Sequence, residues 1–136
     1  MAIELKTVLP KVCRDVEACI GVAVIDLEYG TLMGIHLERP LPQEVVDFLA
    51  AAAARELGGK DVKDIAEMLA AHKKKAAPER KEVSTFTAGN KYHRFVRTKK
   101  NPLHVVCFVC ELGPDVQEGM IVSRASRAMP AIEAAL

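Results

Sequence analysis

The segment Gly21-Val-Ala-Val-Ile-Asp26-Leu-Glu-Tyr-Gly30-Thr-Leu-Met-Gly-Ile35 has two apolar runs on either side of an acidic turn that contains a glycine. Aliphatic and β-branched runs around Asp and Gly are typical of a strand, a tight turn and a second strand. We therefore expect a β-hairpin here. Asp26 and Glu28 lie in its turn, where an Asp side chain usually bonds to the local backbone, so we interpret both as structural rather than catalytic.

A helix is predicted before the hairpin, over about residues 5 to 18. Its apolar residues recur at steps of three and four, the spacing of one helix face: Leu5, Val8, Leu9, Val12, Val16 and Ile20. With Thr7 as the N-cap, Pro10 falls in the first turn, where its missing N–H would have no intrahelical partner. The proline is then compatible with the helix.

Two more helices are predicted after the hairpin. The first starts near Pro42, contains five consecutive alanines at 50–54 and stops at Gly58-Gly59. The second covers Asp61 to Lys75 and ends in three lysines, which the helix dipole favours. Its apolar residues share one face: Val62, Ile65, Met68 and Leu69.

The rest of the chain predicts three strands and a helix. Val83 to Ala88 and Tyr92 to Thr98 flank a Gly89-Asn90 turn, and a third strand from Leu103 to Glu111 is nearly all apolar, which predicts a central strand covered on both faces. Gly113-Pro114-Asp115 is expected to open the last helix. The fold class is therefore α+β, a five-stranded antiparallel sheet with flanking helices in the order α-β-β-α(α)-β-β-β-α. Residues 1–136 form a single domain with a basic helical insertion at about 60–81.

Composition restricts the class of protein. The chain has 136 residues, of which 50% are hydrophobic and 27% charged, as in one globular domain. Its longest charge-free apolar stretch, 103–110, is far shorter than a membrane span. The N-terminus has no secretory pattern, so we expect a cytoplasmic protein.

Catalytic and metal-binding motifs are not evident. Cys107 and Cys110 have the spacing of a zinc knuckle, but on one strand they point to opposite faces. The four histidines fall on different predicted elements, so we expect neither a metal site nor a cofactor. The chain also lacks a phosphate-binding glycine loop and a G-x-S-x-G nucleophile turn. We therefore expect no enzymatic activity, and a cysteine-based redox activity ranks last.

The charge is uneven. Residues 72–104 carry ten Lys or Arg against two Glu, a balance of +8 that leaves −7 for the remainder of a chain with net charge +1. One interpretation is a basic partner surface that binds nucleic acid or another polyanion, and the other is a solvated strand edge. The basic partner surface would comprise Lys73, Lys74, Lys75, Arg94, Arg97, Lys99 and Lys100.

The element order and the first hairpin, Gly21 to Met33, resemble the roadblock/dynein light chain family. That resemblance implies a profilin-like, roadblock-like fold and a non-enzymatic protein. It also implies dimers that act as scaffolds or regulators of small Ras-like GTPases or motor complexes.

Transferred by position, the resemblance places a homodimer interface on the middle helix and the strand after it. Alanine-rich helices pack closely, and an exposed strand edge can be completed by a symmetry mate. On this basis Ala53→Glu is expected to weaken dimerisation. A small-ligand sensory domain is a further alternative. The sequence does not decide the identity of the partner, the choice between homodimer and heterodimer, or whether residues 60–81 are ordered. The expected interface residues are Phe48, Leu49, Ala52, Ala53, Val83, Thr85 and Thr87.

Overall fold

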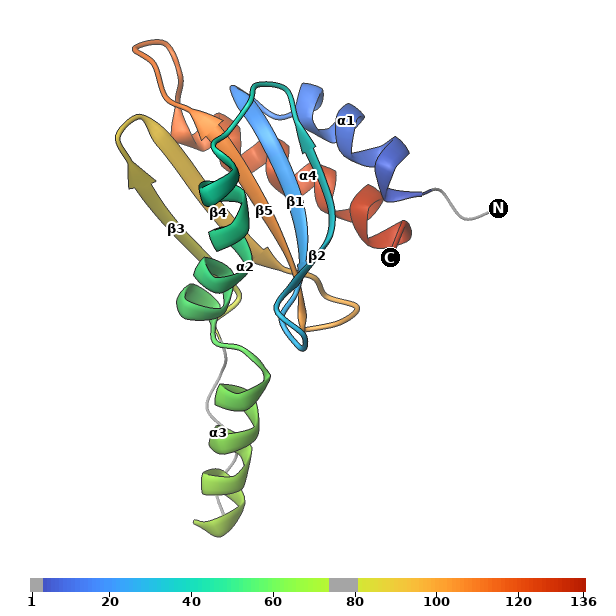
Figure 1. The fold of residues 1–136 in the computed structure, drawn as a ribbon, viewed down its shortest axis with the longest axis vertical. Coiled ribbons are helices and arrows are strands. Elements are labelled where there is room, and N and C mark those ends of the chain that lie inside the picture. Colours follow the sequence, from blue (N-terminus) through green and yellow to red (C-terminus); the bar gives the residue numbers. More distant parts are fainter. Residues whose placement is uncertain (1–3, 74–80) are drawn as a thin grey trace.

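A five-stranded antiparallel sheet lies at the centre of the structure, a computed structural model that describes residues 4–73 and 81–136 (Figure 1). The elements follow the predicted order. The helices are α1 (Leu5–Asp15), α2 (Gln43–Leu57), α3 (Lys60–His72) and α4 (Glu118–Ala134), and the strands are β1 (Cys19–Asp26), β2 (Thr31–Leu37), β3 (Val83–Ala88), β4 (Lys91–Arg97) and β5 (His104–Glu111).

The strands are arranged in the order β2-β1-β5-β4-β3, so β5 is central, as its apolar sequence predicts. β1 and β5 are buried along almost their whole length, whereas β2 and β3 form the two edges. The first hairpin is confirmed, and Asp26 Oδ1 accepts a hydrogen bond from the Glu28 amide at 2.8 Å in its turn. Asp26 is therefore a turn residue, as expected.

Helices cover the two faces of the sheet unequally (Figure 1). α1 and α4 lie together on one face, where Val106, Phe108 and Cys110 of β5 point. α2 alone packs on the other face, against the alternate residues of β5, which include Cys107. The expectation that Cys107 and Cys110 face opposite sides is confirmed.

The predicted N-cap of the first helix and the predicted start of the last helix are wrong. α1 begins at Leu5, as expected, and ends at Asp15, but it follows Glu4, so Thr7 is not the N-cap and Pro10 lies inside the helix. Packing explains why the helix includes Leu5: a Cβ on Gly34 of β2 would lie only 3.2 Å from Leu5 Cδ1, so this first turn lies close to the sheet. α4 begins at Glu118, because the Val116 amide donates to the Gly113 carbonyl in a turn that precedes the helix.

α3 extends away from the sheet in Figure 1. Gly58 ends α2 with a φ of 81°, a conformation that glycine adopts without strain, and α3 follows at once. Lys74 and Lys75 of the predicted helix lie outside the described residues. In residues 4–73 and 81–136, no helix combines the length and the apolar character that crossing a membrane requires.

Candidate interaction surface

Exposed large apolar side chains are concentrated on α2 and α3. Phe48 of α2 has the second-largest exposed fraction on these two helices, 66%, although its neighbours on the helix are core residues. Elsewhere in the described part of the chain, the exposed large apolar side chains are Tyr29, Met33, Ile35, Val83 and Met120. Exposed apolar patches are typical of interaction sites. We call the patch on the two helices the apolar surface, and it comprises Val45, Phe48, Val62, Ile65, Met68 and Leu69.

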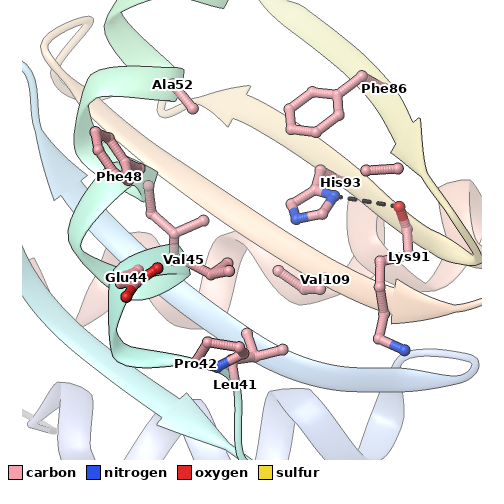
Figure 2. Close-up of a pocket in the computed structure, with 12 residues that line it drawn as sticks. Leu41, Pro42, Glu44, Val45, Phe48, Ala52, Phe86, Lys91, His93 and Val109 are labelled. Carbon is pink, nitrogen blue, oxygen red and sulfur yellow. Dashed lines mark hydrogen bonds between the residues drawn. The ribbon is translucent and has the colours of Figure 1, made fainter.

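A groove of about 520 Å³ separates α2 from β3 and β4 (Figure 2). Val45, Phe48 and Ala52 form its helical wall, and Phe86 and His93 lie opposite on the sheet. The lining is almost entirely apolar. It exists because α2 is the only helix among the described residues that packs on this face, and α2 does not reach across β3.

His93 and Phe86 form the sheet wall of the groove. They are cross-strand neighbours, and their rings stack at a centroid distance of 4.4 Å and an interplanar angle of 10°. His93 Nδ1 lies 3.2 Å from the Lys91 carbonyl oxygen, and burial lowers the pKa of His93. The imidazole is therefore neutral at neutral pH and adds no charge to the groove.

The expected interface residues on α2 divide into two groups. Phe48 and Ala52 line the groove, but Leu49 and Ala53 are 3% and 0% exposed and belong to the subunit's own core. The four-residue step from Leu49 to Ala53 to Leu57 places these side chains on the inward face of the helix. Ala53→Glu would therefore put a carboxylate into the core, and that substitution reports on folding rather than on dimerisation.

The expected residues on β3 lie on an edge strand. Val83, Thr85 and Thr87 are exposed, and among the described strands only β4 pairs with β3. The intervening Ser84 points to the other side, where its Oγ donates to Glu56 Oε2 of α2 at 2.7 Å. This bond holds β3 beside α2, so the open strand edge and the apolar helix form one side of the molecule.

The expected basic partner surface is not one surface in the described residues. Arg97 is only 6% exposed, and its guanidinium donates to the carbonyl oxygens of Lys81 at 2.7 Å, Pro102 at 2.6 Å and Gly58 at 3.1 Å, and also to that of Leu57. These bonds join three chain segments, a structural role that its place in a basic stretch does not reveal.

The other members of that set are dispersed. Arg94 lies on the opposite face of β4 from Arg97, because successive strand residues point to opposite faces and these two are three positions apart. Lys73 follows α3, whereas Lys99 and Lys100 lie in the connection from β4 to β5, and all three are exposed. Lys74 and Lys75 are outside the described residues.

Solved structures share this architecture. The Roadblock/LC7 domain from Streptomyces avermitilis matches with a TM-score of 0.62 over 96% of both chains, at 8% sequence identity. This chain has the fold of a Roadblock/LC7 domain. The gliding protein MglB from Thermus thermophilus matches with a TM-score of 0.60 at 15% identity, over 96% of this chain and 87% of that one. A structure of MglB with a tetrameric arrangement matches with a TM-score of 0.61 at 16% identity, over 96% and 89%.

No family model matches the sequence, and no curated protein matches it either. The resemblance predicted from the hairpin and the element order is thus confirmed at the level of the roadblock fold.

Three cysteines of this roadblock fold gather where α1, β1 and β5 meet. Cys13 Sγ donates to Cys19 Sγ at 3.4 Å, and Cys19 pairs with Cys110 in the sheet register. Hydrogen bonding to the Cys110 side chain raises the pKa of Cys19 to about 12, and a hydrogen bond to Cys19 raises the pKa of Cys13. Because the thiolate is the nucleophilic form, these raised pKa values disfavour nucleophilic reactions of Cys13 and Cys19 at neutral pH.

Proposed function

We propose that this protein is a non-enzymatic interaction module, a homodimer that acts as a scaffold or regulator of a small Ras-like GTPase or a similar signalling protein. The observation that carries the proposal is the apolar surface on α2 and α3, beside the open edge of β3. The roadblock fold supports it, because the family resemblance implies dimeric GTPase-associated scaffolds. MglB, which shares the fold, has been described both as a gliding protein and with a tetrameric arrangement.

The two β3 edges are the natural centre of such a dimer. An exposed edge has unpaired N–H and C=O groups, and an antiparallel symmetry mate satisfies them while extending the sheet. The two-fold axis then brings the α2 helices of both copies to the same side, where Phe48 can fill the partner's groove. Aromatic side chains in such pockets usually dominate the binding energy.

α3 supports the same assembly. Its apolar stripe, Val62, Ile65, Met68 and Leu69, is more than half exposed at every position. An amphipathic helix needs a second surface to bury such a face. A second copy that is bound across α2 and β3 lies next to the start of α3 and can cover it.

Self-association tests this proposal most simply. Sedimentation equilibrium of the wild type should show a dimer, and Phe48→Glu should raise its dissociation constant at least about tenfold, because a carboxylate would be buried in an apolar contact. Met33→Glu is the matched control, since Met33 is an exposed apolar residue on the opposite edge strand, β2. A monomeric wild type, or equal effects of the two substitutions, would contradict the homodimer.

The partner is tested by affinity capture from the native lysate at low and at moderate salt. Recovery of a small GTPase that survives moderate salt supports the scaffold function. Recovery of nucleic acid alone, lost as the salt concentration rises, favours the polyanion alternative, because phosphate contacts are strongly salt-dependent.

The groove favours a second candidate, a small apolar ligand. Its volume of about 520 Å³ is within the range of ligand sites. Thermal-shift measurements with a panel of fatty acids and aromatic acids test this function. Ala52→Phe, which fills the groove from its helical wall, should abolish any stabilisation.

A further inference from the structure

Cys13, His36 and Glu38 converge at the end of α1, on the face of the sheet opposite the groove. The Cys13 sulfur, a His36 ring nitrogen and a Glu38 carboxylate oxygen all lie within 4.8 Å of one another. His36 Nε2 is 3.0 Å from Glu38 Oε1, and Cys13 Sγ is 3.4 Å from Cys19 Sγ. Three different kinds of metal ligand, from a helix and a strand, therefore meet at one point.

The local structure explains why they meet. Leu5, Leu9 and Cys13 are four residues apart and form one stripe of α1. Gly34, His36 and Glu38 alternate along β2 and its extension, so they point to one face of the sheet. A Cβ on Gly34 would lie 3.2 Å from Leu5 Cδ1 and 3.4 Å from Leu9 Cδ1. The first part of the helix therefore rests on the glycine, and Cys13 follows one turn later, over the imidazole and the carboxylate.

We propose that Cys13, His36 and Glu38 bind a zinc ion. Either water or Cys19, whose Sγ lies 3.4 Å from that of Cys13, would be the fourth ligand. Tetrahedral zinc with bonds of about 2.0–2.3 Å requires ligand atoms about 3.3–3.8 Å apart. His36 Nε2 and Glu38 Oε1, 3.0 Å apart, are slightly too close, and every pair of ligand atoms lies within 4.8 Å, so changes in side-chain rotation can complete the site. A sulfur and an imidazole select zinc over magnesium or calcium, which prefer oxygen ligands.

Burial and charge agree with an ion at this position. The Cys13 side chain is buried, whereas the His36 and Glu38 side chains are 28% and 39% exposed, which gives an ion access from solvent. Zinc would displace the Cys13 thiol proton, and the resulting thiolate and the Glu38 carboxylate would neutralise its two positive charges. The resting hydrogen bonds of the cluster, between His36 and Glu38 and between the two thiols, would be exchanged for bonds to the metal.

The ion would fasten α1 to edge strand β2, far in the fold from the α2, α3 and β3 elements of the proposed dimer. Zinc should therefore stabilise the subunit without changing its self-association. This separation makes the inference independent of the proposed function, since either can fail alone.

Metal titration of the reduced 136-residue chain, after chelation and removal of the chelator, tests the site. Cobalt serves as the spectroscopic substitute for zinc. We expect one cobalt per chain with a thiolate-to-cobalt charge-transfer band and tetrahedral d–d bands, and displacement of both by one equivalent of zinc. Zinc should also raise the melting temperature.

Variants assign the ligands. His36→Gln and Glu38→Gln are changes at partly exposed positions that leave the core intact, and each should weaken cobalt binding more than about tenfold, the lower limit seen even for residues that only support a ligand. Cys13→Ser should abolish the charge-transfer band if Cys13 is the single sulfur ligand, and reduce it by about half if Cys19 is also bound. Cys19→Ser should reduce the sulfur-to-cobalt intensity by about half if Cys19 is the fourth ligand, and leave it unchanged if water completes the site; both results agree with the proposal.

Two controls separate this site from adventitious binding. His72→Gln removes an exposed imidazole at the end of α3, and Cys107→Ala removes a thiol on the α2 face of the sheet. Neither should alter cobalt binding. The proposal would be overturned by a wild type without a charge-transfer band or a zinc-dependent melting temperature, or by a His36→Gln protein, folded by circular dichroism, that binds cobalt as tightly as the wild type.

Discussion

The two faces of the sheet differ in how completely the chain covers them. On one face, α1 and α4 enclose a core that includes Phe108, Ile121 and Ile132, all of them fully buried. On the other face, α2 alone covers β1 and β5, leaving a groove beside β3 and an exposed Phe48. The first face holds the subunit together, and the second has apolar area left over for another molecule.

The largest expected effect is the difference in protein stability between two phenylalanine substitutions, one on each side of the sheet. Phe108→Ala should lower the free energy of unfolding by about 3–5 kcal/mol, because it leaves a cavity in a closed core. Phe48→Ala should change monomer stability by less than about 0.5 kcal/mol, since the side chain is largely exposed. Urea unfolding, at a protein concentration low enough to favour monomers, measures both. Similar losses in the two variants would contradict the difference between the faces.

The next effect compares two arginines on opposite faces of β4. Arg97→Met should lower the free energy of unfolding by about 2–4 kcal/mol, because it leaves the buried carbonyl oxygen of Leu57 and the partly buried one of Pro102 without their donor. Arg94→Met is the control: Arg94 Nε is buried without a hydrogen-bond partner, so its removal should cost less than about 1 kcal/mol. Urea unfolding of both variants would measure these changes in the free energy of unfolding. If Arg94→Met is the more destabilising change, Arg97 is not the residue that joins these segments.

The smallest effect concerns the ion pairs at the end of the groove. Glu111 accepts hydrogen bonds from Lys91 Nζ at 3.2 Å and Arg39 Nη1 at 2.9 Å, and these bonds hold its pKa below the ordinary 4.5. Because the pKa is lower in the folded state, the stabilisation is present above pH 4.5 and is lost as the pH falls through the folded-state pKa.

Glu111→Gln should therefore lower the melting temperature slightly at about pH 7, and the difference from wild type should shrink at about pH 3. Melting curves at the two pH values measure this. A difference that stays constant with pH would show that the carboxylate charge is not responsible.

Local sequence patterns predicted the strands well and the helix starts less well. The nearly all-apolar sequence of β5 predicted a strand that is covered on both faces, and its central position in the sheet confirms this. Thr7 was expected to be the N-cap because a helix that begins there has Pro10 in its first turn. In the structure Leu5 packs close to Gly34, a residue distant in the sequence, and α1 begins before Thr7.

The interaction surface could be predicted only in part. Phe48, Leu49, Ala52 and Ala53 are all apolar, so composition alone could not show which side of α2 faces the sheet. The step from Leu49 to Ala53 to Leu57 could have indicated the inward side. That assignment would then have placed Phe48 on the outward side of α2, where a partner can contact it.

The remaining features are non-local. Arg97 binds carbonyl oxygens, which every residue carries, so no sequence motif marks its partners. Cys13, His36 and Glu38 come together only because α1 crosses β2 in the folded chain. Their spacing in the sequence matches no metal-binding pattern, and this explains why the sequence predicted no metal site.

The association of two copies through α2 and β3 is the central claim, and amide hydrogen exchange measured at several protein concentrations tests it most directly. As the concentration rises through the dissociation constant, exchange should slow in peptides that cover β3 and α2, because the β3 edge amides gain partners. Exchange in β2, the other edge strand, should not change. Slowing in β2 or α1 without slowing in β3, or no concentration dependence in any peptide, would contradict the account.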